Sequence, residues 1–221
     1  MYDLQKLLSS VGIYIDDKQR EFFQKYIDLL LIWNKRTNLI SRKDESRVIE
    51  KHILESLSFM LSFKIQPSAK IIDIGSGAGF PGLPISLICP DSNFVLVESK
   101  RLKALFLKEV VAQLQLNNVE VFCERVENLT KNMKYKGQFD FVFSRAVASL
   151  REVYDWIQDL IKPNGFYIAW KGGDILQEVE DLKRIFKNII INIVEMDRQL
   201  ISPDTRKVFV RIQRNISTME E

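Results

Sequence analysis

Histidine and cysteine are scarce in this chain of 221 residues, which holds one histidine, His52, and two cysteines, Cys89 and Cys123. A lone histidine builds neither a metal site nor a catalytic triad. Two cysteines without C-x-x-C spacing exclude a zinc motif and a disulfide framework. We therefore expect no metal and two reduced cysteines in the core. For His52 we expect a structural or orienting role, with direct chemistry as the alternative.

The chain also lacks a long hydrophobic run and a strong excess of charge. No apolar segment approaches the roughly 20 residues of a membrane-spanning helix, and residues 1–6 lack the layout of a signal peptide. The net charge is +3, with 46% hydrophobic and 28% charged residues, which is typical of a globular chain. Such a charge permits a nucleic-acid partner but hardly argues for one. We expect a cytoplasmic protein that binds no membrane.

A glycine-rich stretch at residues 71–82 is the strongest signal, with the sequence Ile-Ile-Asp-Ile-Gly-Ser-Gly-Ala-Gly-Phe-Pro-Gly. It predicts a buried strand, a tight loop and a helix that begins near Pro81, because proline suits the first helical turn. Glycines allow a positive φ and let a ligand approach the backbone. Free N–H groups at the helix start favour an anionic ligand group. The stretch is typical of the first turn of a nucleotide-binding α/β domain.

Two cofactors fit this loop. Gly77, Gly79 and Gly82 match G-x-G-x-x-G, which indicates a dinucleotide. Asp73, Gly75, Gly77 and Gly79 match the D-x-G-x-G-x-G pattern of S-adenosylmethionine methyltransferases. The acid favours the second cofactor, because a pyrophosphate disfavours a carboxylate beneath it whereas the amino group of a methionine moiety can bind one. A glycine-rich turn without a ligand is the third alternative.

The hydrophobic period changes along the chain. Residues 1–62 show helical spacing, with one face at Phe22, Tyr26, Leu29, Leu30 and Trp33 and a second at Ile49, Ile53, Leu57, Met60 and Leu61. From residue 70, strands predicted at 70–74, 93–98, 119–123, 139–143 and 166–170 alternate with helices, of which 101–115 is the clearest. Such alternation predicts a parallel sheet whose carboxyl ends meet at one rim, where ligands bind.

The last two predicted strands, near 188–196 and 207–213, have no helix between them and should pair antiparallel. An antiparallel last strand is a feature of the methyltransferase version of this fold. We therefore expect a Rossmann-like α/β fold of the class I S-adenosylmethionine methyltransferases, with a seven-stranded, mostly parallel sheet. The expected organisation is a helical extension over residues 1–62 packed on a catalytic domain over 63–214, with a tail over 215–221.

Residues that follow the predicted strands supply a cofactor site. Glu98 closes the second strand, where an acid accepts from both ribose hydroxyls; a helix cap ahead of Lys100 is the alternative. Val126 and Glu127 follow the third strand, where they can cover an adenine ring and accept from its amino group. Surface charge is the alternative for that pair.

The fourth and fifth strands end in cations. Arg145 offers a fork for a carboxylate or a phosphate, and Lys171 is a second cation on the same rim. The fourth strand carries no Asn-Pro-Pro-Tyr signature for amine methylation and no cysteine nucleophile for a C5-pyrimidine mechanism. Between the two N-terminal helical faces, basic residues gather at Lys35, Arg36, Arg42, Lys43, Arg47 and Lys51. They form either a solvated surface or an edge that contacts phosphates.

Over nearly its whole length the chain resembles the bacterial family called glucose-inhibited division protein B, the small-subunit ribosomal RNA guanine-N7 methyltransferases. The resemblance rests on residues 34–38, 51–57, 73–84, 144–150 and 171–172. It implies S-adenosylmethionine as cofactor, with contacts at Gly75, Phe80, the Val126–Glu127 pair and Arg145. It also implies methylation of N7 of a guanine in 16S ribosomal RNA, position 527 by the family's name. The implied partner is that RNA or a small-subunit particle, and we expect a monomer.

The implied reaction needs little catalytic machinery. Guanine N7 carries an in-plane lone pair and no proton, so no base is required before it attacks the methyl group. Arg145, Lys171 and His52 are therefore candidates for positioning roles, because alignment alone lowers the barrier. The residues alone leave other functions open: a methyltransferase acting on a small molecule or protein, an NAD-binding oxidoreductase, or an RNA-binding assembly factor without turnover.

Overall fold

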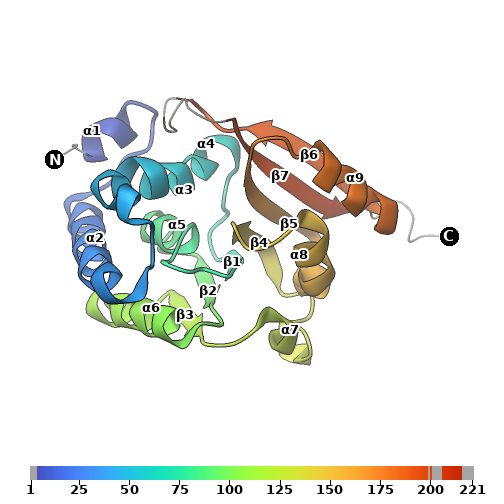
Figure 1. Cartoon of the computed structure of the whole chain (residues 1–221), viewed down its shortest axis with the longest axis horizontal. Coiled ribbons are helices and arrows are strands. Elements are labelled where there is room, and N and C mark those ends of the chain that lie inside the picture. The colour runs from blue at the N-terminus through green and yellow to red at the C-terminus, as the bar shows by residue number, and fades with distance from the viewer. Residues whose placement is uncertain (1–3, 199, 201–205, 216–221) are drawn as a thin grey trace.

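A seven-stranded sheet forms the centre of the computed structural model, which describes residues 4–198, 200 and 206–215 (Figure 1). Its strands lie in the order β3-β2-β1-β4-β5-β7-β6, and β7 alone runs antiparallel to its neighbours. The strands are β1 (Lys70–Ile74), β2 (Asn93–Val97), β3 (Val119–Phe122), β4 (Phe139–Arg145), β5 (Ile161–Gly172), β6 (Ile189–Glu195) and β7 (Lys207–Arg214). The predicted sheet with its antiparallel last strand is confirmed.

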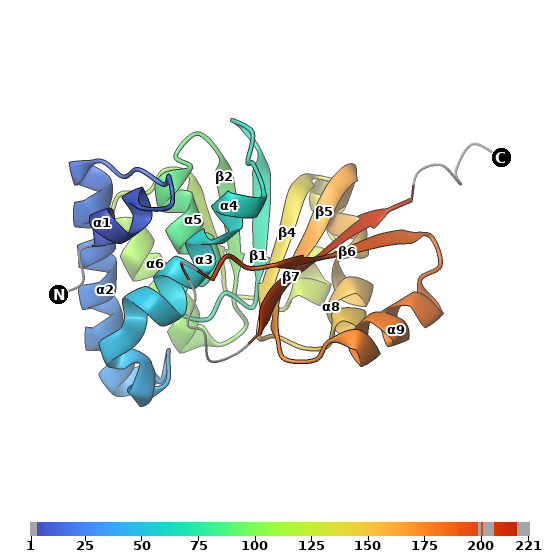
Figure 2. The ribbon, with the colours of Figure 1, turned by 90° about the horizontal axis from the view of Figure 1, so that it is seen from above.

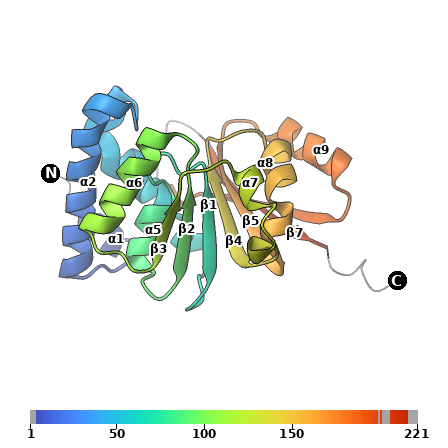
Figure 3. The same cartoon turned by 90° about the horizontal axis from the view of Figure 1, so that it is seen from below.

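Helices cover both faces of the sheet. Figure 2 shows α1 to α6 on one side and α8 and α9 on the other, and Figure 3 shows α7 beside α8. The helices are α1 (Leu4–Ser9), α2 (Asp17–Thr37), α3 (Glu55–Leu57), α4 (Phe59–Ser62), α5 (Gly82–Ile88), α6 (Arg101–Gln113), α7 (Val126–Leu129), α8 (Leu150–Ile157) and α9 (Leu176–Ile185). Short helical turns lie at η1 (Arg42–Arg47), η2 (Ile49–Leu54), η3 (Met133–Tyr135) and η4 (Gln158–Leu160).

The strands are apolar on both faces because each face packs against helices. Alternate residues point to opposite faces, so Phe141 and Phe143 join the core beneath α1 to α6, whereas Val142 joins the core beneath α7 to α9. Tyr26 and Leu30 of α2 belong to the first of these cores and are fully buried. The N-terminal helices therefore share a hydrophobic core with the sheet.

The first predicted helical face is confirmed, since α2 spans it from a capping box at Asp16 and Gln19. The second predicted face is not one continuous helix. It divides into the π-helical η2, α3 and α4, and the hydroxyls of Ser56 and Ser58 donate to the carbonyl oxygens of His52 and Glu55. Serine back-bonding of this kind bends helices, and π-turns are frequent at functional sites.

Cys123 is exposed, so the prediction that both cysteines lie in the core is wrong for this residue. It follows β3, a strand at the edge of the sheet that pairs only with β2. Cys89 is half-buried, and burial raises the pKa of its thiol to about 11. In the described part of the chain, no helix combines the length and apolar character needed to span a membrane. The predicted tail lies outside the described residues except for Asn215.

Candidate active site

The loop between β1 and α5 adopts backbone conformations that demand glycine. Gly75 has φ +67°, and a Cβ there would lie 2.7 Å from Cγ2 of Val147 in the loop after β4. Gly79 has φ +101°, and its amide donates to the carbonyl oxygen of Ser76 at 2.7 Å. The loop is tight, as the glycine pattern predicts, and it packs against the loop after β4.

Asp73 is fully buried at the end of β1. Its Oδ2 accepts from the amide of Gly82 at 3.1 Å, and its Oδ1 has no hydrogen-bond partner among the residues that the structure describes. Burial raises the pKa of this carboxyl to about 7, although the hydrogen bond from Gly82 opposes the rise. The bond also occupies an amide at the start of α5. That amide is not free for an anionic ligand, contrary to the expectation from sequence.

Glu98 links two backbone segments at the end of β2. Its Oε2 accepts from the amide of Gly77 at 3.0 Å and its Oε1 from the amide of Lys100 at 2.7 Å. The second bond lies where the capping alternative places it, directly before α6. Each carboxylate oxygen has a further lone pair. The predicted ribose contact is therefore compatible with this arrangement and stays a prediction.

A pocket of about 190 Å³ opens beside these residues at the carboxyl rim of the sheet. Val126, which is buried, and Glu127 contribute to its wall, together with Gly75 and Val147. The full lining is Ile74, Gly75, Val97, Ser99, Glu124, Arg125, Val126, Glu127, Val147 and Trp156. Apolar walls with a few polar groups suit a flat heteroaromatic ring.

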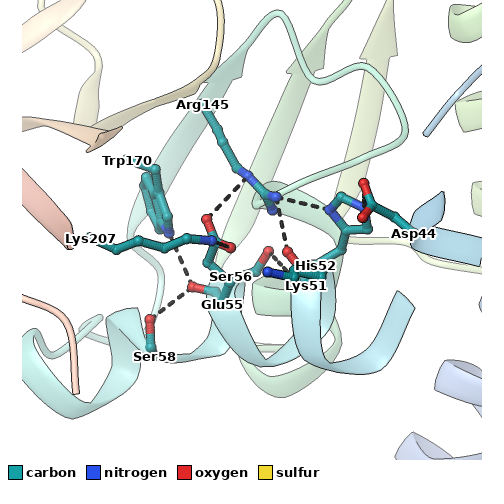
Figure 4. Close-up of polar contacts among 9 residues, drawn as sticks. All are labelled: Asp44, Lys51, His52, Glu55, Ser56, Ser58, Arg145, Trp170 and Lys207. Atoms are coloured by element: carbon teal, nitrogen blue, oxygen red, sulfur yellow. Dashed lines mark hydrogen bonds and ion pairs between the residues drawn. The ribbon is translucent and has the colours of Figure 1, made fainter. Parts of the chain in front are cut away.

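Arg145, the last residue of β4, reaches the N-terminal helices (Figure 4). Its Nη2 donates to the carbonyl oxygen of Lys51 at 3.0 Å and lies 2.8 Å from Nδ1 of His52. Its Nε lies 3.6 Å from Oε1 of Glu55, and its Cζ lies 5.7 Å from the centre of the Phe80 ring. Nη1 is buried and has no hydrogen-bond partner within the described residues.

His52 is held as a neutral imidazole. Burial, reinforced by the charge of Arg145, lowers its pKa to about 3. Because a guanidinium only donates, Nδ1 must accept and the proton lies on Nε2, which is 3.8 Å from Oδ2 of Asp44. The ring stacks on Phe80 with centroids 4.8 Å apart. These contacts support the orienting role predicted for His52.

Lys171 does not lie beside Arg145. Arg145 pairs with Trp170 across β4 and β5, so Lys171, one residue further, points to the opposite face of the sheet. Its Nζ donates to Oε2 of Glu178 at 2.7 Å and to the carbonyl oxygen of Ala148 at 2.9 Å. The two cations share a rim, as predicted, but each is bound to its own partners.

Asp73 and Arg145 lie on the same face of neighbouring strands, because Ile74 pairs with Ser144 and each stands one residue from that pair. Each carries one buried atom without a partner in the described structure, an acceptor on Asp73 and a donor on Arg145. Buried polar atoms are normally satisfied. A carboxylate acceptor and a guanidinium donor match the ammonium and carboxylate of an amino-acid moiety such as that of S-adenosylmethionine.

Sequence reasoning missed the structural partners of this site. Tyr26 donates from α2 to the carbonyl oxygen of Ala78 in the glycine loop at 2.6 Å, and its ring lies against Phe80. Lys207 of β7 forms an ion pair with Glu55. Helical spacing places Tyr26 only on an apolar face. Glu55 lies in a segment that carries the family resemblance, but no feature of the sequence pairs it with Lys207.

The basic N-terminal residues divide into two groups. Lys35, Arg36, Arg42, Lys43 and Arg47 are exposed, whereas Lys51 is half-buried. We call the five exposed cations the basic segment. Its first two residues lie in the last turn of α2 and its other three in η1, just before η2, whose His52 contacts Arg145. The alternatives of a solvated surface and a phosphate-contacting edge both suit this exposure.

A protein-family model described as rRNA small subunit methyltransferase G matches residues 19–207. A protein of that name from Thermoanaerobacter pseudethanolicus is 40% identical over 178 residues, 80% of this chain and 74% of the relative. Another, from Dictyoglomus thermophilum, is 32% identical over 218 residues, 99% of this chain and 90% of the relative.

Solved structures resemble the fold. A SAM-dependent methyltransferase from Aquifex aeolicus matches with a TM-score of 0.55 at 17% identity, over 77% of this chain and 95% of that one. TYW2 from M. jannaschii, solved in complex with AdoMet, matches with a TM-score of 0.53 at 13% identity, over 79% of this chain and 78% of that one. The predicted class I methyltransferase fold is thereby confirmed.

Proposed function

Because the chain belongs to the rRNA small subunit methyltransferase G family, we propose that it transfers a methyl group from S-adenosylmethionine to N7 of a guanine in 16S ribosomal RNA. The observation that carries this proposal is the family match, which spans residues 19–207 and includes every candidate site residue. The buried, unpartnered atoms of Asp73 and Arg145 support the choice of cofactor.

S-adenosylmethionine supplies an electrophilic methyl group when it is bound. Asp73 Oδ1 would accept from its ammonium group, and Arg145 Nη1 would donate to its carboxylate, since both atoms are buried without a partner in the described structure. Glu98 keeps lone pairs for the ribose hydroxyls, and Val126 with Glu127 borders the pocket that suits adenine. The remaining proposed contacts are those of the glycine loop and the ring beside it: Gly75, Gly77, Gly79 and Phe80.

The residues around Arg145 position groups and do not transfer protons. Guanine N7 has no proton to remove, and His52 is a neutral ring whose pKa of about 3 makes it a poor general base at neutral pH. Lys171 donates to the carbonyl oxygen of Ala148, so we assign it to holding the loop after β4, against which Gly75 packs. Alignment of N7, methyl and sulfur is then the main catalytic contribution.

The basic segment is the proposed contact for RNA phosphates, because cations there are exposed and close in sequence to the η2 turn that meets Arg145. In this view residues 1–62 form an extension that serves both RNA binding and the support of the glycine loop, and residues 63–214 form the catalytic domain. We propose that the protein acts as a monomer in the cytoplasm, where its RNA substrate is assembled into ribosomes.

Methyl transfer from radiolabelled S-adenosylmethionine tests the proposal on three substrates: naked 16S RNA, an assembly particle and the finished small subunit. We expect label in N7-methylguanosine at one site of at least one substrate. Label in another base, or in protein or small molecules only, would contradict the proposal and favour a different class I methyltransferase. Calorimetric titration with S-adenosylhomocysteine and NAD separates the oxidoreductase alternative, for which only NAD would bind.

A further inference from the structure

The guanidinium of Arg145 shares its carboxylate partner with a second cation. Glu55 of α3 has a nearly buried side chain, and Figure 4 shows it between Arg145 on one side and Lys207 on the other. Its Oε1 faces Arg145 Nε at 3.6 Å, beyond hydrogen-bond distance, whereas its Oε2 is bound to Lys207 Nζ. The carboxylate is thus tied more closely to Lys207 than to Arg145.

This division is unusual for a buried arginine and carboxylate, which commonly form two parallel hydrogen bonds. Here Nη2 is occupied by the Lys51 carbonyl and His52, Nε only faces Glu55, and Nη1 has no partner in the described structure. The backbone oxygen of Glu55 accepts from Trp170 Nε1 at 3.2 Å, which fixes the position of the residue. Glu55 is therefore close enough to form a hydrogen bond with Nε, and so to draw the guanidinium toward itself, if Lys207 released it.

We propose that Lys207 is a positioning residue for the cofactor site: by binding Glu55, it keeps the guanidinium of Arg145 from being drawn toward Glu55 through Nε, so that Nη1 stays in place for the carboxylate of the cofactor. The proposal rests on the function proposed above, in which Arg145 binds that carboxylate. Lys207 touches no proposed ligand atom and acts through Glu55. Lys207 lies at the start of β7, the last strand in the chain. Through Glu55, this strand would therefore affect a site that is built by β1, β4 and the N-terminal helices.

The substitution Lys207→Met tests this inference, because it keeps a long apolar stem and removes the charge. Glu55 then draws the guanidinium of Arg145 toward itself through Nε, and we expect the affinity for S-adenosylhomocysteine to fall by about tenfold or more, the effect of one charge-assisted hydrogen bond. Affinity for 5′-methylthioadenosine should stay within about twofold, because that probe lacks the carboxylate. Calorimetric titration of the full chain measures both.

The double variant Lys207→Met/Glu55→Gln is the decisive measurement. A neutral amide attracts a guanidinium much less than a carboxylate does, so we expect the affinity for S-adenosylhomocysteine to return to within about threefold of the parent protein. A purely structural role of Lys207 would instead give two losses that add. Arg206→Ala is the matched control, since Arg206 precedes Lys207 and forms an exposed ion pair with Glu195.

The outcomes separate this inference from the proposed function. Unchanged affinity in Lys207→Met, an equal loss for both probes, or no recovery in the double variant would overturn the role of Lys207 while Arg145→Ala still loses S-adenosylhomocysteine. If Arg145→Ala also binds normally, Arg145 is not the carboxylate ligand and the role of Lys207 falls with that assignment, whereas the proposed methyl transfer, which rests on the family match, is tested by the radiolabel assay. Thermal midpoints of the ligand-free variants identify any variant that fails to fold, and for such a variant Lys207→Gln replaces Lys207→Met.

Discussion

The hydroxyl of Tyr26 donates to the carbonyl oxygen of Ala78 across 52 residues of sequence, with the two oxygens 2.6 Å apart. Tyr26 belongs to α2, in the N-terminal helical region, and Ala78 lies in the glycine loop after β1. Both residues are buried, and the Tyr26 ring also lies 5.7 Å from that of Phe80. The N-terminal helices are therefore part of the wall that shapes the candidate cofactor site.

Tyr26→Phe should loosen the glycine loop without disturbing the core. It keeps the ring and leaves the buried carbonyl oxygen of Ala78 without a partner, at a cost of about 1–3 kcal/mol. We expect a lower thermal midpoint and weaker binding of S-adenosylhomocysteine, measured by calorimetry. Tyr14→Phe, at an exposed position, is the control and should change neither. Full affinity in Tyr26→Phe would show that the loop holds its shape without α2.

Gly77→Val should abolish cofactor binding while the protein stays folded. Gly77 has φ +59°, and the nearest atom to an added Cβ, the carbonyl oxygen of Gly75, is 3.8 Å away, so the side chain would extend into the space beside the loop. Gly137→Val is a matched control, because Gly137 has φ +60° in open space and incurs the same backbone strain. We expect both variants to lose the same amount of thermal stability. Only Gly77→Val should lose S-adenosylhomocysteine binding. A folded Gly77→Val that binds normally would remove this loop from the site.

Asp73→Asn should change the pH dependence of both stability and binding. The folded pKa of Asp73 is raised to about 7 from 3.8, so its contribution to stability is present at low pH and is lost as pH rises from about 4 to about 7. We expect urea unfolding without cofactor to show that the free energy of unfolding of the variant, relative to that of the parent, is higher at pH 8 than at pH 4 by a few kcal/mol. Asp155→Asn, at an exposed position, is the control.

Cofactor affinity should depend on the ionisation of Asp73 in the opposite direction from stability, increasing with pH. The ionised carboxylate of Asp73 is the form that accepts from an ammonium group, so the affinity of the parent for S-adenosylhomocysteine should rise as pH passes about 7. In Asp73→Asn the affinity should be lower and should not follow this titration. A parent affinity that is flat between pH 6 and pH 8 would argue against contact between Asp73 and the amino group.

Substitutions in the basic segment should act on RNA affinity, whereas Arg145→Ala should act on the rate of methyl transfer. Removal of Arg36, Arg42 or Lys43 should weaken RNA binding and reduce its salt slope by about one unit for each phosphate that is no longer neutralised. Arg184→Ala, an exposed cation on α9, should leave the salt slope unchanged. Single-turnover kinetics at several salt concentrations and saturating cofactor measure both quantities.

For Arg145→Ala and Lys171→Ala, the lower rate should persist at saturating RNA, because misalignment acts within the complex. Complete rescue of Arg145→Ala by additional RNA would identify Arg145 as another phosphate ligand. The proposed division, in which the basic segment sets RNA affinity and these two residues set the rate of methyl transfer, would then be wrong.

Local features of the sequence were sufficient to predict the frame of the molecule. The alternation of apolar strands with helices predicted the first five strands, and the missing helix between the last two predicted strands indicated the antiparallel β7. The glycine loop was predictable because positive φ at Gly75, Gly77 and Gly79 is a property of single residues. The division of the second predicted helix into η2, α3 and α4 was not predicted, since its apolar spacing does not distinguish an α-helix from a segment that contains a π-helical turn.

Charge pairing at the site was decided by the tertiary structure alone. Arg145 meets His52 across 93 residues and Lys207 meets Glu55 across 152, and neither spacing has a periodic signature. Lys171 and Arg145 both end strands at one rim, yet the register of β4 and β5 places them on opposite faces of the sheet. The sequence by itself determined which segments become strands, loop and helices, because those choices follow from local backbone preference and burial. Which ions share a partner was determined only by folding, because Coulomb interactions depend on distance in space and on burial, and neither is written in the order of residues.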